Sequence, residues 1–212
     1  MNRTVFVMLF LLVTNLPALP QEPKPAVEVT DQQWQELLLA VSNENWDTAV
    51  DFSAKYLKQL KEGDERLPRL RYIYLYAAAG KVSEGGMSFD QLAESLKDFI
   101  GKEVNLPYRP ITEHCRGALN FICSSEGTKD KLQVAATNRA GTTIHAFEYV
   151  LLKEPFDIGG HEGQQASLGG IIDSVIPNPN KSRFLVMRIY ISKGFVMLRE
   201  QAPKKASFII GD

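Results

Sequence analysis

Three residues in one long loop carry the side chains of a hydrolytic triad. The segment from 154 to 170 contains five glycines and, among them, Asp157, His161 and Ser167. A serine hydroxyl, an imidazole and a carboxylate perform acyl transfer when each lies within hydrogen-bond reach of the next. Long ordered loops are often functional. This loop therefore offers one hypothesis, a hydrolase with its site at Asp157, His161 and Ser167.

Neither motif in this loop is complete. The run from His161 to Gln165 resembles the zinc-protease helix motif, but Gln165 stands where the second histidine belongs, and the flanking glycines disfavour a helix. The run from Gln165 to Gly169 lacks the first glycine of a nucleophile elbow. The sequence also has no phosphate-binding loop and no dinucleotide fingerprint. We therefore predict no metal site and no cofactor, assign no catalytic residue, and keep the loop hydrolase as an alternative.

A second set of candidate residues belongs to a predicted helix. Arg69, Tyr72 and Tyr76 recur at i, i+3 and i+7, on a face away from the apolar stripe that contains Leu70 and Ile73. Tyrosine and arginine are over-represented where binding energy is concentrated. We interpret this face as the lining of a binding groove, with an ordinary solvated surface as the alternative.

Residues 30–103 are predicted to form a separate helical domain of two antiparallel helical hairpins, followed by a β-rich domain at residues 104–212. Thr30 with Gln33, and Ser88 with Gln91, are capping boxes that mark two helix starts. Asn45 is a third N-cap, and Gly80 is the expected C-terminal cap of the helix that opens near residues 67–68. The candidate groove residues lie on that helix.

Part of this region resembles a known repeat family. Trp34, Leu37, Val41 and then Ala49 on the partner helix are similar to a degenerate tetratricopeptide unit. The second hairpin departs from the pattern, because its loop from 81 to 87 is stretched and the repeat spacing exceeds the nominal period. The resemblance implies protein or peptide binding, since stacked repeats expose an extended concave surface.

Residues 104–212 change to a strand-like pattern. The expected strands are separated by turn signals, and the last two form a hairpin around Ser192-Lys193-Gly194. We expect strands at 132–136, 143–152, 171–176, 183–191 and 195–198. The chain is thus predicted to be an α+β protein whose C-terminal part is an all-β sandwich, immunoglobulin-like in preference to a small barrel. Binding of carbohydrate or cell-envelope material by this part is a further alternative function.

Whether the two cysteines form a disulfide depends on how residues 110–124 fold. The sequence is compatible with a helix or a strand there. Eight residues separate Cys115 from Cys123, about 12 Å in a helix or about 26 Å in a strand. A disulfide needs Cα atoms within about 7 Å, so only a chain reversal at Arg116-Gly117 permits a bridge. Two buried thiols are the favoured interpretation and a disulfide is the alternative.

The N-terminus predicts export. Arg3 precedes an apolar run from Val5 to Val13 that is too short to span a bilayer, which is typical of a signal peptide covering residues 1–18. Residues 19–29 read as a linker. The chain has 24 Lys and Arg against 25 Asp and Glu; removal of residues 1–18 takes away Arg3 and no acid, which leaves 23 against 25. This balance argues against nucleic-acid binding.

Together these patterns favour an exported, periplasmic or extracellular, non-catalytic protein. Its helical part is expected to bind a protein or peptide, and its β part to position the helices. The protein is not expected to be an integral membrane protein after cleavage, and envelope association is compatible with this interpretation.

Overall fold

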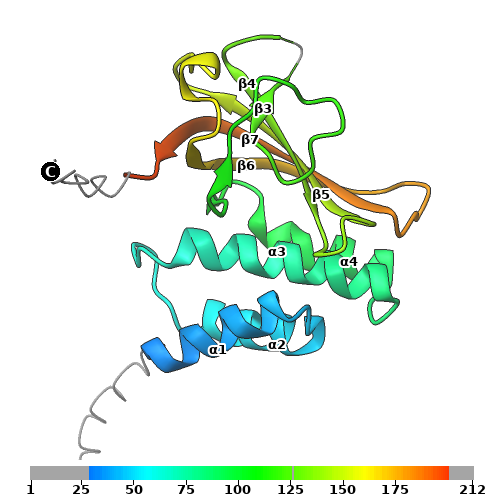
Figure 1. Ribbon diagram of the computed structural model, residues 1–212. Coiled ribbons are helices and arrows are strands. Elements are labelled where there is room, and N and C mark those ends of the chain that lie inside the picture. Colours follow the sequence, from blue (N-terminus) through cyan, green and yellow to red (C-terminus); the bar gives the residue numbers. More distant parts are fainter. Residues whose placement is uncertain (1–28, 126, 201–212) are drawn as a thin grey trace, which may run out of the picture.

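The computed structural model describes residues 29–125 and 127–200. The α-helices occupy the first part of this range and the strands the second, with one short 3-10 helix, η2 (Gly159–His161), between strands, so the predicted α+β architecture is confirmed (Figure 1). The predicted signal peptide and most of the predicted linker lie outside the described residues.

The helices begin where their capping residues predict. The helices are α1 (Asp31–Ser42), α2 (Trp46–Leu57), α3 (Leu67–Glu84) and α4 (Phe89–Leu96), followed by the short 3-10 helix η1 (Lys97–Phe99). Both capping boxes are present, with Thr30 accepting from the Gln33 N–H and Ser88 from the Gln91 N–H. Asn45 caps α2 through the N–H of Thr48.

Gly80 does not end α3, contrary to the sequence prediction. The helix continues to Glu84 and is capped by Gly85, whose φ of 86° is left-handed. Gly80 instead allows a close approach, because a Cβ at this position would lie 2.4 Å from the Trp46 ring. Its role is therefore to let α2 pack closely against α3.

The strands form one hydrogen-bonded sheet in the order β1-β6-β7-β5-β4-β3, with β2 also paired to β6. Its members are β1 (Glu103–Asn105), β2 (Arg109–Pro110), β3 (Cys123–Ser124), β4 (Lys131–Thr137), β5 (Ile144–Leu152), β6 (Gln165–Pro177) and β7 (Leu185–Leu198). The first half of β6 pairs with β1 and β2 along one edge and with the second half of β7 along the other. The first half of β7 pairs with β5. The β part is not closed into a barrel.

The hairpin expected at Ser192-Lys193-Gly194 is wrong. β7 runs continuously through these residues, with Lys193 at a φ of 50° and a register shift against β5. A Cβ at Gly194 would lie 2.5 Å from Val150 Cγ1, so glycine permits the strands to approach. The turn signal thus marks an irregularity inside a strand.

Residues 110–124 are neither one helix nor one strand. The chain reverses near Arg116 and Gly117, and Gly117 has a left-handed φ of 74°. This reversal brings the Cα atoms of Cys115 and Cys123 to 5.4 Å and closes a disulfide. The favoured interpretation of two buried thiols was therefore wrong, and the alternative holds.

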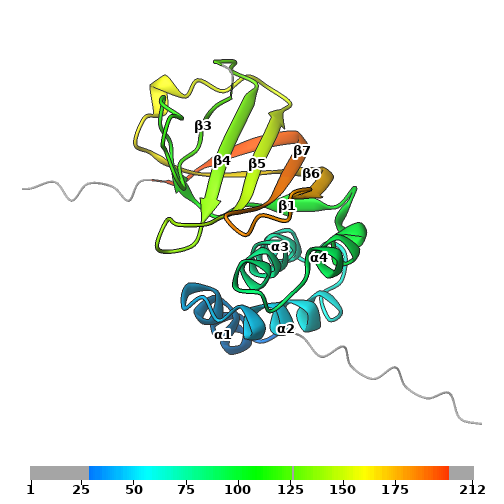
Figure 2. The same cartoon turned by 90° about the vertical axis from the view of Figure 1, so that its right-hand side faces the viewer.

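The helices lie against one face of the sheet (Figure 2). α3 contacts β1, β5 and β7, and α4 contacts β6, while α1 and α2 form the layer farther from the sheet. Buried side chains of helices and strands join in a single hydrophobic core. Helix α3 is consequently buried on most of its circumference. Among residues 29–125 and 127–200, no helix is both long and apolar enough to cross a membrane.

Candidate binding groove

A groove of about 200 Å³ opens between two helices and the segment that leads into β2. Helix α1 contributes the side chains of Leu38 and Val41. The remaining lining residues are Arg69, Tyr72, Ile73 and Tyr76 of α3 with Pro107 and Arg109. The groove thus brings together all three residues that the helical spacing singled out.

The exposure of these residues differs from the sequence expectation. Arg69 is exposed, but Tyr76 is half-buried and Tyr72 is only 4% exposed. The prediction that Tyr72 lies on a solvent-exposed face is wrong, because the sheet covers that side of α3. Arg69 therefore stands at the rim of the groove, and Tyr72 forms part of its wall.

Behind this wall, Tyr72 joins two buried charges. Its hydroxyl donates to Oε1 of Glu148 over 2.6 Å and accepts from Nη2 of Arg109 over 2.9 Å. Arg109 and Glu148 are themselves 3.9 Å apart, and Glu148 is fully buried. A buried charge persists only when it is paired and hydrogen-bonded. The three side chains therefore depend on one another.

A second layer of hydrogen bonds holds the Arg109 guanidinium. Nη1 of Arg109 donates to Oδ1 of Asn120 over 2.6 Å, and the same oxygen accepts the N–H of Thr137. Tyr76 donates its hydroxyl proton to the Thr137 carbonyl over 2.5 Å. Asn120 belongs to the loop closed by the disulfide, so that cross-link helps to position Arg109.

The hydroxyl protons of both tyrosines are retained. Burial raises the pKa of Tyr72 well above its ordinary value, and burial raises the pKa of Tyr76 to about 12. Burial also raises the pKa of Glu148, against the opposing effects of the Arg109 charge and the Tyr72 hydrogen bond. Because both tyrosine protons are already donated to protein acceptors, the rings present mainly apolar surface to the groove.

The three residues of the alternative hydrolase site in segment 154–170 each contact a different partner. Ser167 is buried in β6 and donates to the Leu106 carbonyl over 2.5 Å. Asp157 pairs with Lys129 over 3.3 Å, and the ring of His161 stacks on Phe156. Within the described part of the chain, no hydrogen bond joins Asp157, His161 and Ser167 to one another.

The network residues Arg109, Asn120 and Glu148 were missed by the sequence analysis. One signal was available for Glu148: it alternates with Ala146 and Val150, which face the core, so its carboxylate occupies an inward position of β5. No sequence signal paired Arg109 or Asn120 with it. Among the described residues, no group of three or more His, Cys, Asp and Glu side chains is placed to hold a metal ion.

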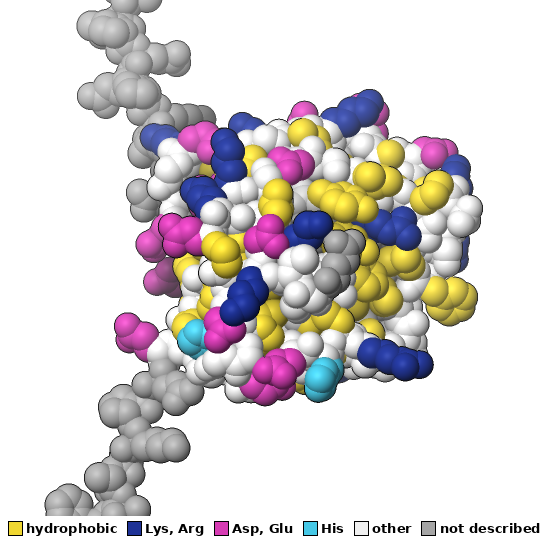
Figure 3. All heavy atoms as spheres, turned by 90° about the horizontal axis from the view of Figure 1, so that it is seen from above, with side chains coloured by type: hydrophobic (Ala, Val, Ile, Leu, Met, Phe, Trp, Pro, Cys, Tyr) yellow, Lys and Arg dark blue, Asp and Glu magenta, His cyan; other side chains and the backbone are white. Residues whose placement is uncertain are grey.

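The opposite face of the sheet carries a larger cavity, of about 460 Å³. Tyr149 and Tyr190 line it with their rings stacked at 5.1 Å, and Phe147 stacks on Tyr149. Asp173 and Ser125 supply polar groups. Figure 3, which views the molecule from above Figure 1, shows hydrophobic side chains gathered on this side.

Buried His145 gives the structure a predicted sensitivity to acid. Its ring contacts those of Trp46 and Tyr76 at centroid distances of 5.0 and 4.9 Å, and neither ring nitrogen has a hydrogen-bond partner among the residues that the structure describes. Burial lowers the pKa of His145 from 6.5 to about 4, against the opposing effect of the Glu44 charge. Between these pH values the unfolded chain binds the proton more readily than the folded protein. The free energy of unfolding should therefore fall as the pH drops, by at most about 3 kcal/mol.

Urea unfolding of the wild type and of His145→Phe at pH 7.0 and pH 5.0 tests this expectation. Glu148 has the opposite dependence, because its raised pKa makes the folded protein the better proton binder. The difference between wild type and variant isolates His145. An identical pH slope in both proteins contradicts the prediction.

Comparisons with known proteins found no match. No protein-family model matches the chain. No curated protein and no solved structure matches it either. The resemblance to tetratricopeptide repeats therefore stays a prediction.

Proposed function

We propose that this chain is an exported, non-catalytic binding protein whose groove receives one large apolar side chain of a peptide or protein partner. The observation that carries this proposal is the apolar groove between α1, α3 and the segment before β2. Its volume of about 200 Å³ is the size of a single large side chain, smaller than an ordinary small-molecule pocket.

Charge favours an acidic group beside that apolar side chain. Arg69 is exposed at the rim of the groove. Arg109 also lines the groove, but the buried Glu148 carboxylate 3.9 Å away balances its charge. An arginine at a rim steers and selects oppositely charged partners. The preferred partner motif is thus a large apolar residue with Asp or Glu close to it in sequence.

Selection from a random peptide-display library tests this function. Wild-type protein should enrich peptides that combine Leu, Ile or Phe with an acidic residue. Leu38→Ser should abolish enrichment, whereas Leu39→Ser is a matched control, because Leu39 is the next residue of α1, is 60% exposed and does not line the groove. Arg69→Glu should retain the apolar preference and lose the acidic one. Enrichment that is unchanged by Leu38→Ser contradicts the proposal.

Export is supported by two features of different origin. The charged and apolar pattern of residues 1–18 has the form of a signal peptide. The Cys115–Cys123 disulfide fits an oxidising compartment, since structural disulfides are rare where thiols are kept reduced.

The mature protein should begin between Leu19 and Glu22. N-terminal sequencing of the product from its native host measures this directly. A soluble cytoplasmic product that retains Met1 is the outcome that refutes export.

Carbohydrate binding is a second candidate function, favoured by the cavity at Tyr149 and Tyr190. Aromatic rings offer an apolar surface for the C–H faces of a sugar, and Asp173 and Ser125 offer hydrogen-bonding groups for its hydroxyls. A glycan array probed with wild type and with Tyr190→Ala tests it. Binding that Tyr190→Ala leaves intact, or no binding by either protein, rejects this candidate.

A further inference from the structure

The groove lies next to the end of the last strand. The Arg199 guanidinium, one residue beyond β7, lies over the Tyr108 ring at 5.6 Å from its centroid. Tyr108 does not itself line the groove, but its two neighbours in the chain, Pro107 and Arg109, do. The described chain therefore ends, at Glu200, close to the segment that carries Pro107 and Arg109.

The sequence beyond Glu200 contains the motif that we propose for a partner of the groove. Phe208, Ile209 and Ile210 form an apolar run, and Asp212 follows two residues later. The eight residues from Glu200 to Phe208 can span up to about 28 Å. Along α3, Arg69 and Tyr76 are separated by only about 10 Å of helix rise. The chain is thus long enough to bring Phe208 to any part of the groove.

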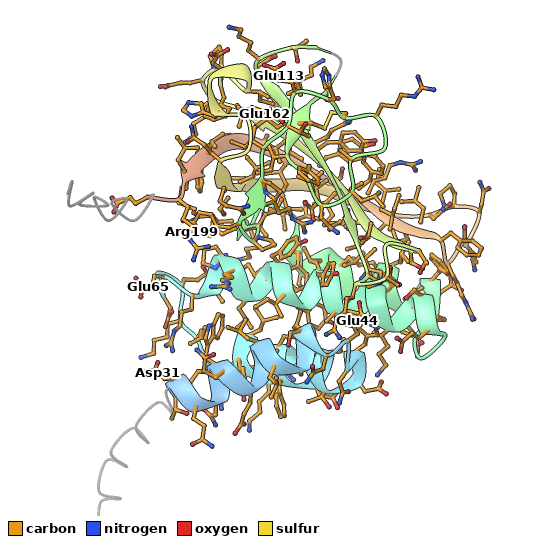
Figure 4. All side chains as sticks on the ribbon, in the orientation of Figure 1. Asp31, Glu44, Glu65, Glu113, Glu162 and Arg199 are labelled. Carbon is orange, nitrogen blue, oxygen red and sulfur yellow. A yellow bond between two sulfur atoms is a disulfide. The ribbon has the colours of Figure 1, made fainter. Side chains whose placement is uncertain are left out.

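Charges at this end of the molecule match those of the segment. Arg69 at the rim is complementary to Asp212. Lys204 and Lys205 are opposite in charge to Asp31 in the first turn of α1 and to Glu65, two residues before α3. Figure 4 shows Arg199, Glu65 and Asp31 at the same end of the molecule. Arg199 follows β7, Glu65 precedes α3, and Asp31 begins α1.

We propose that the segment Phe208–Asp212 of the same chain docks in the groove, with an apolar side chain between α1 and α3 and Asp212 near Arg69. This inference rests on the groove being a binding site. It adds a mechanism by which the chain itself controls access of a partner peptide to the groove. A partner peptide must displace the tethered segment, so the groove discriminates against weak partners. At an effective concentration of about 1 mM, a segment with a Kd of about 0.1 mM lowers the apparent affinity of a partner about tenfold.

Paramagnetic broadening in the full oxidised chain tests the docking. Ser207→Cys provides a single reactive thiol for a nitroxide label, because Cys115 and Cys123 are joined. The methyl signals of Leu38 and Val41 should be lost, and those of Ile176, which does not line the groove and lies in β6, should persist. Adding Phe208→Asp and Ile210→Asp to the labelled chain should restore the groove signals.

A mixing experiment identifies the occupant. Labelled chains without isotopes are mixed with isotopically enriched chains without the nitroxide. Loss of the Leu38 and Val41 signals in this mixture means that the segment of a second copy occupies the groove, which overturns docking within one chain. Groove signals that persist in the singly labelled chain overturn it as well.

Affinity measurements separate this inference from the proposed function. A display-selected peptide should bind Phe208→Asp about tenfold more tightly than wild type. Broadening without any selected peptide supports the docked segment and refutes the external partner. Equal peptide affinity for wild type and Phe208→Asp, with no broadening, supports the partner and refutes the docked segment.

Discussion

Replacing Arg109 with methionine should lower the free energy of unfolding at pH 7 by about 3–5 kcal/mol. Arg109 is 3.9 Å from the fully buried Glu148 and donates to the Tyr72 hydroxyl and to Asn120. Methionine keeps most of the apolar stem and removes the charge. Glu148 is then left as an uncompensated buried carboxylate, which is the costly outcome when one partner of a buried pair is removed.

Urea denaturation of Arg109→Met at pH 7.0 and pH 5.0 measures this loss. Burial raises the pKa of Glu148 above that of the unfolded chain. The folded protein therefore binds the proton more tightly, and the deficit of the variant should shrink as the pH falls toward 4.5. The double variant Arg109→Met with Glu148→Gln should recover most of the stability. A loss below about 1 kcal/mol, in the range of exposed ion pairs, contradicts the interpretation.

Local signals in the sequence predicted the helices well, because caps are satisfied within a few residues. Thr30 with Gln33 and Ser88 with Gln91 complete their hydrogen bonds inside one turn, so no distant residue has to be known. The prediction that Gly80 ends α3 was wrong because its role depends on a distant residue. The Trp46 ring of another helix packs against Gly80. No pattern of neighbouring residues in the sequence predicts this contact.

The errors in the β part have the same origin. Ser192-Lys193-Gly194 has the composition of a hairpin turn, but β7 pairs with β5 and β6 on either side of it. Two neighbouring strands together override a local turn preference. The cysteine pair was decided by the reversal near Gly117, which the sequence analysis had identified as the one geometry that permits a bridge.

The candidate site was half predictable. The spacing of Arg69, Tyr72 and Tyr76 correctly placed them along one groove, but spacing alone does not tell whether a sheet covers that side of the helix. Glu148 was visible as a charge in an inward strand position. Its partners come from α3 and β2, more than 35 residues away in the chain, so only the tertiary structure reveals the network.

Tyr72 is the residue at which stability and binding can be separated. Tyr72→Ala should cost about 3–5 kcal/mol, as expected for removal of a buried aromatic side chain. Tyr72→Phe keeps the ring and removes only the hydroxyl between Glu148 and Arg109, so it should cost about 1–3 kcal/mol. Arg69→Ala, at an exposed position, should change the free energy of unfolding by less than about 0.5 kcal/mol.

For peptide binding we expect the reverse order: Arg69→Ala should lose more affinity than Tyr72→Phe. Tyr72→Phe retains the apolar wall of the groove, so a display-selected peptide should bind it nearly as tightly as wild type, at temperatures where both are folded. Arg69→Ala removes the rim charge and should weaken binding of acidic peptides with little effect on folding. Urea unfolding and fluorescence titration of the same protein preparations give both quantities. If Arg69→Ala binds like wild type while Tyr72→Phe loses the peptide, the groove does not recognise its partner through the rim charge. The Tyr72 hydroxyl would then be the recognising group, in conflict with its hydrogen bonds to Glu148 and Arg109.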